Sequence, residues 1–243
     1  MLKTISSRDN PLIKRFVALS HSAPARKRDG MCLLEGEHLA QSYTERVGAL
    51  EIVAIRDTGA LTAPQQQLVS RAKEAVCVAP SLFDSLSTLI SPSGVLAIAT
   101  VPPTAAPATN GFVLALDDVQ DPGNVGTLIR TAAAAGVAQV WLSSGCAFAW
   151  SVKTLRAAQG AHFHTQVLEG VELLGALQSF GGKRWATLPR NHEAVNVSSL
   201  FDAKFGAANV VVLSNEGHGL SPTLLPAITD GVSIPMAAGV ESL

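Results

Sequence analysis

The sequence predicts an α/β protein whose second half is a parallel sheet covered by helices on both faces. From residue 112 onward, short apolar runs of strand length alternate with helical patterns, which is the order that a parallel sheet requires. A proline-rich, uncharged stretch at 101–111 separates this half from a smaller α/β unit. Apolar residues fill 47% of the 243 positions and charged residues 15%, which is enough for a core in each unit.

The first unit is predicted to be a small α/β domain covering residues 1–100. A helical pattern occupies 37–47, between short apolar runs that end at turn residues. Residues 101–111 contain three prolines and no charge, so they are expected to form a stiff linker. The strands of the first unit are expected at 51–57, 75–79 and 94–100.

The second unit is predicted to cover residues 112–243. Its first segment, 112–118, consists of five apolar residues followed by two aspartates and indicates a strand buried on both faces of a sheet. A further helix is expected to begin at Ser221-Pro222. The other helices are expected at 127–136, 152–159 and 171–180, and the other strands at 138–143, 163–168, 184–188, 209–213 and 232–236.

The charge balance excludes a protein that binds nucleic acid through bulk positive charge. Lys and Arg number 18 against 19 Asp and Glu, which leaves a net charge of -1. Seven of the basic residues nevertheless fall within the first 28 positions. This leading segment is either an anion-facing arm or a solvated surface, and the composition does not decide between them.

The remaining composition predicts an intracellular protein without a metal site. The first residues carry charges where the apolar core of an export signal would have to be. Three cysteines without a CxxC pair suggest neither a disulfide framework nor a zinc site, and a reducing cytoplasm is expected. His162 and His164 share strand spacing but lack an acidic or cysteine neighbour, so no metal is expected there.

The segment 116–136 is the first that carries chemistry. It leaves a buried strand through a turn, in which Asn124 is expected to cap the following helix and Gly136 to close it. Arg130 is a cation in an otherwise small and apolar helix, a position that favours an anion or a cleft beside it. The glycines Gly123 and Gly126 match neither a dinucleotide fingerprint nor a P-loop.

Two later segments also run from a strand into a glycine-containing turn. In 209–222 the turn holds a single carboxylate, Glu216, between a strand and Gly217. The histidine beside it, His218, is expected to be inert. In 232–243 the apolar Ile234-Pro235-Met236 suits a flat ring such as adenine. Because ligands bind at the carboxyl ends of parallel strands, both turns are candidate binding loops.

Three segments in fixed order carry a family resemblance: DPGNVGTLIRTAAAAG at 121–136, VVLSNEGHGLS at 211–221 and IPMAAGVESL at 234–243. Together they resemble the signature motifs of the SpoU family, the TrmH-like RNA ribose 2′-O-methyltransferases. Near the N-terminus, SSRDNPLIKRF, GMCLLEGEHLAQ and ISPSGVLAIA resemble the substrate-binding domain found in one branch of that family.

The resemblance implies a deep trefoil knot at the C-terminal part of the sheet (the SPOUT fold), a homodimer, and S-adenosylmethionine bound in the knot. The implied partner is RNA, with ribosomal RNA favoured over transfer RNA, contacted by Arg8, Lys14, Arg15 and Arg130. The implied catalytic residues are Asn124, Arg130, Glu216 and Ser242. The implied cofactor-binding residues are Leu188, Leu213, Ser214, Asn215, Gly217, Ile234, Pro235, Met236, Ala238 and Leu243.

Some questions remain open at this level. Arg130 is proposed as the base in the family, but a guanidinium does not readily lose a proton and is better suited to hold a phosphate and polarise the hydroxyl. The family motif continues past Ser242-Leu243, so the C-terminus is expected to be truncated. The alternatives to the enzyme are a non-catalytic RNA-binding protein with the same fold and a transferase that uses another nucleotide cofactor.

Overall fold

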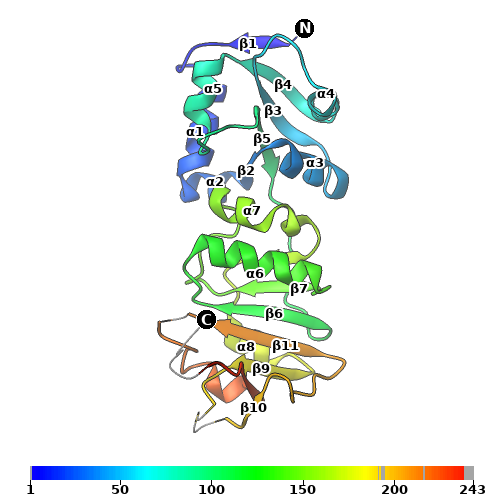
Figure 1. Cartoon of the computed structure of the whole chain (residues 1–243), viewed down its shortest axis with the longest axis vertical. Coiled ribbons are helices and arrows are strands. Elements are labelled where there is room, and N and C mark those ends of the chain that lie inside the picture. The colour runs from blue at the N-terminus through cyan, green and yellow to red at the C-terminus, as the bar shows by residue number, and fades with distance from the viewer. Residues whose placement is uncertain (1, 191, 193–194, 216, 238–243) are drawn as a thin grey trace. The chain divides into compact units, whose positions relative to one another are not determined.

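The computed structural model describes residues 2–190, 192, 195–215 and 217–237 (Figure 1). The chain divides into two compact units. The first consists of the residues up to Pro103 together with Trp150–His164, and the second of Thr104–Ala149 and the residues from Thr165 onward. Among the described residues no helix is long and apolar enough to cross a membrane.

The described part of the first unit holds a five-stranded sheet in the order β1-β4-β3-β5-β2. The pairs β1–β4 and β4–β3 are parallel, whereas β3–β5 and β5–β2 are antiparallel. The mixed sheet agrees with the predicted α/β class, and the predicted strands at 51–57, 75–79 and 94–100 correspond to β3, β4 and β5. The strands are β1 Lys3–Ile5, β2 Met31–Glu35, β3 Leu50–Arg56, β4 Ala72–Val78 and β5 Val95–Thr100.

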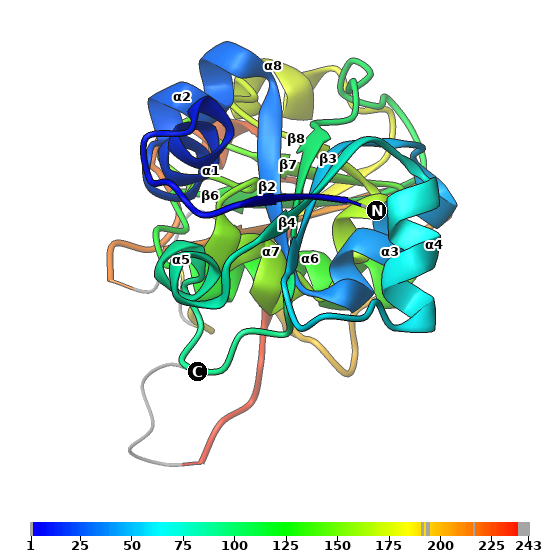
Figure 2. The same ribbon diagram turned by 90° about the horizontal axis from the view of Figure 1, so that it is seen from above.

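Helices cover both faces of this sheet. Helices α1 and α5 pack their Phe16, Leu19 and Phe83 on one face, while α3 and α4 lie against the other (Figure 2). The helix α7 packs beside β2 and adds Val152 to the core on the α1 face. The helices are α1 Pro11–His21, α2 Ala23–Asp29, α3 Glu37–Arg46, α4 Ala63–Ser70, α5 Pro80–Leu86 and α7 Val152–Ala158, followed by a 3-10 turn, η1, at Ala161–Phe163.

The basic leading segment is folded and not an extended arm. Asn10 caps α1 by accepting a hydrogen bond from the amide of Leu12 at 2.9 Å, and Pro11 occupies the first helical position. Arg26 is buried, and its Nη1 donates to the carbonyl oxygens of Leu19 and Ser20 at the end of α1. At least one of the seven early cations is therefore structural.

The described part of the second unit holds a seven-stranded sheet in the order β10-β12-β9-β11-β6-β7-β8, in which every strand pair is parallel. The predicted parallel sheet is confirmed. Its strands are β6 Phe112–Asp117, β7 Gln139–Leu142, β8 Gln166–Leu168, β9 Lys183–Thr187, β10 Val197–Ser199, β11 Asn209–Ser214 and β12 Asp230–Ser233, and its helices are α6 Pro122–Ala134, α8 Leu173–Gln178 and the 3-10 turn η2 Leu225–Ala227.

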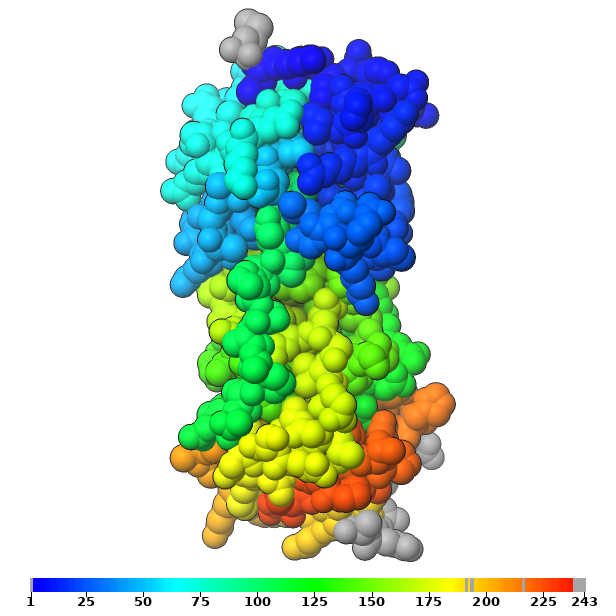
Figure 3. Space-filling view, turned by 180° about the vertical axis from the view of Figure 1, so that it is seen from behind, coloured from blue at the N-terminus to red at the C-terminus, as the bar shows by residue number. Residues whose placement is uncertain are grey.

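The chain leading into β6 is bound to the second unit. Buried Gln139 accepts from the amide of Ala108 at 2.8 Å and donates to the carbonyl of Ala106 at 3.2 Å. The carbonyl of Thr109 accepts from the amide of Gly181 at 2.8 Å. Figure 3 shows this green segment running beside the yellow residues around α8. Part of the stretch predicted as a linker is thus hydrogen-bonded to the second unit along its length at 106–109.

Three local predictions are wrong, for identifiable reasons. The helix predicted after Pro222 is only the turn η2, because Pro226 lacks the amide that would bond to the carbonyl of residue 222 and its ring clashes there. The strand predicted at 232–236 ends at Ser233, shortly before Pro235, which cannot donate to a ladder. His162 lies in η1 and not in a strand, since Gln159 and Gly160 adopt left-handed conformations just before it.

Candidate functional site

The carboxyl ends of four neighbouring strands meet at one edge of the second sheet. Asp117 at the end of β6 pairs with Ser214 at the end of β11. Thr187 at the end of β9 pairs with Val232 of β12, so the residue after β9, Leu188, lies level with the end of β12. All three motif segments therefore leave the sheet at this edge, which is where parallel sheets place their ligands.

The loop after β11 is organised by Asn215. Its Nδ2 donates to the carbonyl of Asp118 at 2.9 Å, and its Oδ1 accepts from the amides of Gly217 at 2.8 Å and His218 at 3.2 Å. Its carbonyl accepts from the amide of Gly219 at 2.9 Å. The Asn215 side chain, which was predicted to bind cofactor, thus mainly holds the loop that would surround the cofactor.

Asp117 is a site residue that the sequence analysis missed. It is buried, and its Oδ2 accepts from the amide of Ser221 at 2.8 Å. Its carbonyl accepts from the amide of Asn215 at 3.0 Å. A carboxylate directly after the apolar run of β6 was the available signal, because such a group is buried at a strand end only where it has donors to satisfy it.

The β6–α6 connection is tightly constrained. Asp118 has a left-handed backbone with a φ of 58°, and its amide donates to Ser143 Oγ at 3.0 Å. A Cβ on Gly145 would lie 1.9 Å from Asp118 Oδ1, so any other residue there would have to displace the side chain of Asp118. The predicted cap is wrong: Asp121 caps α6 by accepting from the amide of Asn124 at 2.9 Å, which places Asn124 inside the first turn.

Asn124 and Arg130 are both exposed on α6 but do not share a face. Six residues correspond to a rotation of about 600° and a rise of about 9 Å along the axis, which leaves the two side chains about 120° apart around the helix. The buried face between the helix and its sheet consists of Val125, Ile129 and Ala132. Arg130 makes no hydrogen bond or ion pair with any residue that the structure describes, so its guanidinium is available to an external anion.

The predicted cofactor residues fall into two groups. Leu188 is buried, and Leu213, Ser214 and Asn215 are half-buried at the sheet edge. Gly217 and Pro235 are exposed, and Ile234 and Met236 retain 43% and 40% of their surface. An apolar segment so exposed beside a strand end is typical of a ligand-binding surface. Glu216, Ala238, Ser242 and Leu243 lie outside the described residues.

Cys146 lies close to the site without reactive character. Its Sγ donates to the carbonyl of Leu116 at 3.2 Å, and burial raises the pKa of the thiol above its usual value. A thiol held neutral in this way is a poor nucleophile. The described residues contain no cluster of three or more His, Cys, Asp or Glu side chains that could hold a metal ion.

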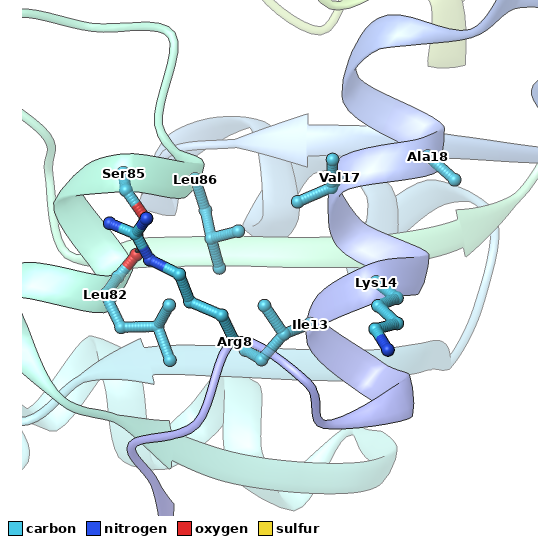
Figure 4. A pocket seen from close by; sticks show the side chains of 8 residues that line it. All are labelled: Arg8, Ile13, Lys14, Val17, Ala18, Leu82, Ser85 and Leu86. Carbon is cyan, nitrogen blue, oxygen red and sulfur yellow. Dashed lines mark hydrogen bonds between the residues drawn. The ribbon is translucent and has the colours of Figure 1, made fainter.

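The predicted RNA-binding residues of the first unit lie on two sides of α1. Arg8 and Lys14 line one groove (Figure 4). Arg15 is half-buried and does not line this groove. Its charge acts on Glu51 instead: the pKa of Glu51 is lowered mainly by its hydrogen bond with Lys73, and the positive charge of Arg15 contributes to the same shift.

The chain matches known proteins along its length. Residues 111–243 match the SpoU rRNA Methylase family, and residues 10–97 match the MRM3-like substrate binding domain. The chain is 30% identical to the 23S rRNA (guanosine(2553)-2'-O)-methyltransferase RlmP of Bacillus subtilis, in an alignment that covers all of this chain and 94% of RlmP. It is also 31% identical to an uncharacterised tRNA/rRNA methyltransferase of Synechocystis, in an alignment that covers all of this chain and 89% of that protein.

A solved structure agrees with these sequence matches. The AdoMet-bound rRNA methyltransferase from Sinorhizobium meliloti superposes with a TM-score of 0.83 at 25% identity, over 99% of this chain and 92% of that one. The family match covers more than half of the chain and includes the strand ends and loops described above. The resemblance of the three motifs is confirmed, and the chain belongs to the SpoU rRNA methylase family.

Proposed function

We propose that this chain transfers a methyl group from S-adenosylmethionine to a ribose 2′-hydroxyl of 23S ribosomal RNA. The observation that carries the proposal is the convergence of the three motif segments at the carboxyl edge of β6, β11 and β12. RlmP, a 23S rRNA guanosine 2'-O-methyltransferase, matches the chain over its full length. The substrate-binding match at residues 10–97 supplies a second unit for the RNA.

The residues at the sheet edge fit S-adenosylmethionine. Ile234, Pro235 and Met236 offer an exposed apolar surface to the adenine, and Leu213 and Leu188 support it from the sheet. The loop held by Asn215 offers backbone groups of Ser214 and Gly217 beside it. Bound there, S-adenosylmethionine supplies an electrophilic methyl group on its sulfonium. Ala238 and Leu243, outside the described residues, are proposed to complete the site.

Arg130 is proposed to orient the RNA at the reacting hydroxyl. A guanidinium stays protonated at every physiological pH, so it acts by donating hydrogen bonds and by its charge. Bonded to the phosphate next to the target ribose and to the 2′-oxygen, it lowers the cost of losing the proton from that hydroxyl. Asn124, Glu216 and Ser242 are proposed as its partners in catalysis.

The strand order supports a deep trefoil knot. Residues 188–196 connect β9 directly to β10, yet β12, which follows much later in the chain, lies between these two strands. A later strand thus lies between two strands that are consecutive in sequence, as it would if the chain passed through the earlier connection; such threading is rare in proteins. We also propose, from the family resemblance, a homodimer that acts in the cytoplasm. Light scattering after gel filtration tests the dimer.

The decisive experiment is transfer of tritium from labelled S-adenosylmethionine. Purified 23S rRNA and total transfer RNA are offered separately, and the product is digested to nucleosides. We expect label in one 2′-O-methylated nucleoside of 23S rRNA. Label in transfer RNA alone would show that the substrate is transfer RNA and not 23S rRNA. RNA binding without any transfer would instead favour the non-catalytic protein, and transfer confined to another nucleotide cofactor would favour the third alternative.

A further inference from the structure

A groove in the first unit lies between α1 and α5 and has a volume of about 470 Å³. Its floor is apolar, formed by buried Ile13, Leu82 and Leu86 with the more exposed Val17. Two cations line its rim. Figure 4 shows Arg8 extending across the groove from the loop before α1 toward Ser85 of α5, with Lys14 on the α1 side.

The rim is cationic because its charges are weakly compensated. The first 28 residues hold seven Lys and Arg but a single acidic residue, Asp9. Asp9 pairs with Lys14 at 3.2 Å, with side chains that are 93% and 64% exposed, and such surface pairs contribute little stability. Arg8 makes no hydrogen bond or ion pair within the described part of the chain. A phosphate can therefore bind both Arg8 and Lys14 while breaking only the weak ion pair between Lys14 and Asp9.

We propose that this groove, the α1–α5 groove, holds one unstacked nucleotide of the RNA substrate. The proposal rests on the proposed function and adds a second contact point far along the sequence from the methyl-transfer motifs. Sequence-specific contacts to RNA are made mainly to unstacked bases, which lie against apolar side chains or arginine planes. A volume of this size is typical of a small-ligand site and suits a single base better than a duplex.

The chemistry of each wall assigns a role to each group. Val17, Leu82 and Leu86 pack against one face of the base. The planar guanidinium of Arg8 stacks on the other face, as arginine does on nucleic-acid bases. Lys14 exchanges its exposed partner Asp9 for the phosphate of the bound nucleotide. An acidic peptide would use the same cations but would not need the flat apolar floor.

The chain offers matched controls on the opposite face of the same sheet. Val47, at the end of α3, is 40% exposed, against 42% for Val17 in the groove. Arg46 is exposed like Arg8 and likewise has no partner among the described residues. Val17→Glu and Val47→Glu therefore introduce the same charge at equal exposure, and Arg8→Gln and Arg46→Gln remove the same charge.

The test measures binding of each full-length variant to a 23S rRNA transcript by filter retention at several salt concentrations. Loss of one stacked base should weaken binding at least about fivefold in Val17→Glu and in Arg8→Gln. Arg46→Gln and Val47→Glu should stay within about twofold of wild type, as surface substitutions do. Transcripts carrying 4-thiouridine should crosslink to peptides of α1 or α5, and Val17→Glu should abolish that crosslink.

The outcomes separate this inference from the proposed function. If the wild-type chain methylates 23S rRNA while both groove variants bind like their controls, the groove assignment is wrong and the activity stands. Equal weakening in all four variants would show only bulk electrostatics and would also overturn the assignment. If the wild-type chain binds the transcript but transfers no methyl group, the proposed activity fails whatever the groove does. A thermal melt of each variant confirms that it is folded.

Discussion

Replacing Asn215 with alanine should loosen the loop after β11 and weaken cofactor binding about tenfold. The side chain makes three hydrogen bonds, to Asp118, Gly217 and His218, and the last two are exposed to solvent. Exposed bonds lie at the low end of the range for net contributions, about 0.5 kcal/mol each, so the three together hold the loop by about 1.5 kcal/mol. If cofactor binds only the ordered loop, that sum corresponds to about one order of magnitude in Kd.

Titration calorimetry with S-adenosylmethionine measures the effect directly. Asn215→Asp serves as the control, because a carboxylate keeps the acceptor for the amides of Gly217 and His218 but turns the donor that faces the Asp118 carbonyl into a second acceptor. Its affinity should fall between wild type and Asn215→Ala. An alanine variant that binds cofactor as tightly as wild type would refute the role given to this loop.

Three further predictions concern activity, stability and pH. Arg130→Gln should abolish methyl transfer in the tritium assay while leaving the calorimetric Kd for S-adenosylmethionine unchanged; retained turnover would contradict its role. Arg26→Met should lower the free energy of unfolding in urea by about 2 kcal/mol, since it removes charged bonds to the end of α1, whereas Arg28→Met, at an exposed pair, should not. Burial raises the pKa of Cys32 from 9.0 to about 12, so the folded thiol keeps its proton where the unfolded one loses it. Stability should therefore fall by up to about 1.4 kcal/mol per pH unit between these values, and less steeply in Cys32→Ala.

The strand ends that carry the site were predictable from the sequence. The predicted strands 112–118 and 209–213 contain uninterrupted apolar runs at 112–116 and 210–213. Such runs are typical of a strand buried in a parallel sheet, and β6 and β11 lie there within one residue. Gly136 was also predictable, because a helix that ends in the left-handed conformation favours glycine, and its φ is 72°. At these positions the residue types of a short segment are sufficient to determine its backbone conformation.

Other features depend on contacts distant in sequence and were missed. The helix α7 was predicted within the second half, and it packs with the first unit because Val152 completes an apolar cluster there. Gln139 is a polar residue in a predicted strand, and its burial was not predicted, because the groups that satisfy it belong to the incoming chain at Ala106 and Ala108. Asp117 is buried for the same reason, through the amide of Ser221. Partners 31 to 104 residues away leave no periodic signal.

The position of β12 makes the proposed cofactor edge depend on a strand that comes late in the chain. β10 has three residues and pairs only with β12 among the described strands, so it has no ladder until the four residues of β12 are in place. β12 pairs with β9 and β10, which precede it by more than thirty residues, so these pairings close longer loops than the pairing of β9 with β11 does. We expect a ligand that contacts the ends of β9, β11 and β12 to add its binding free energy to the pairing of these strands, which would couple cofactor binding to the order of this edge.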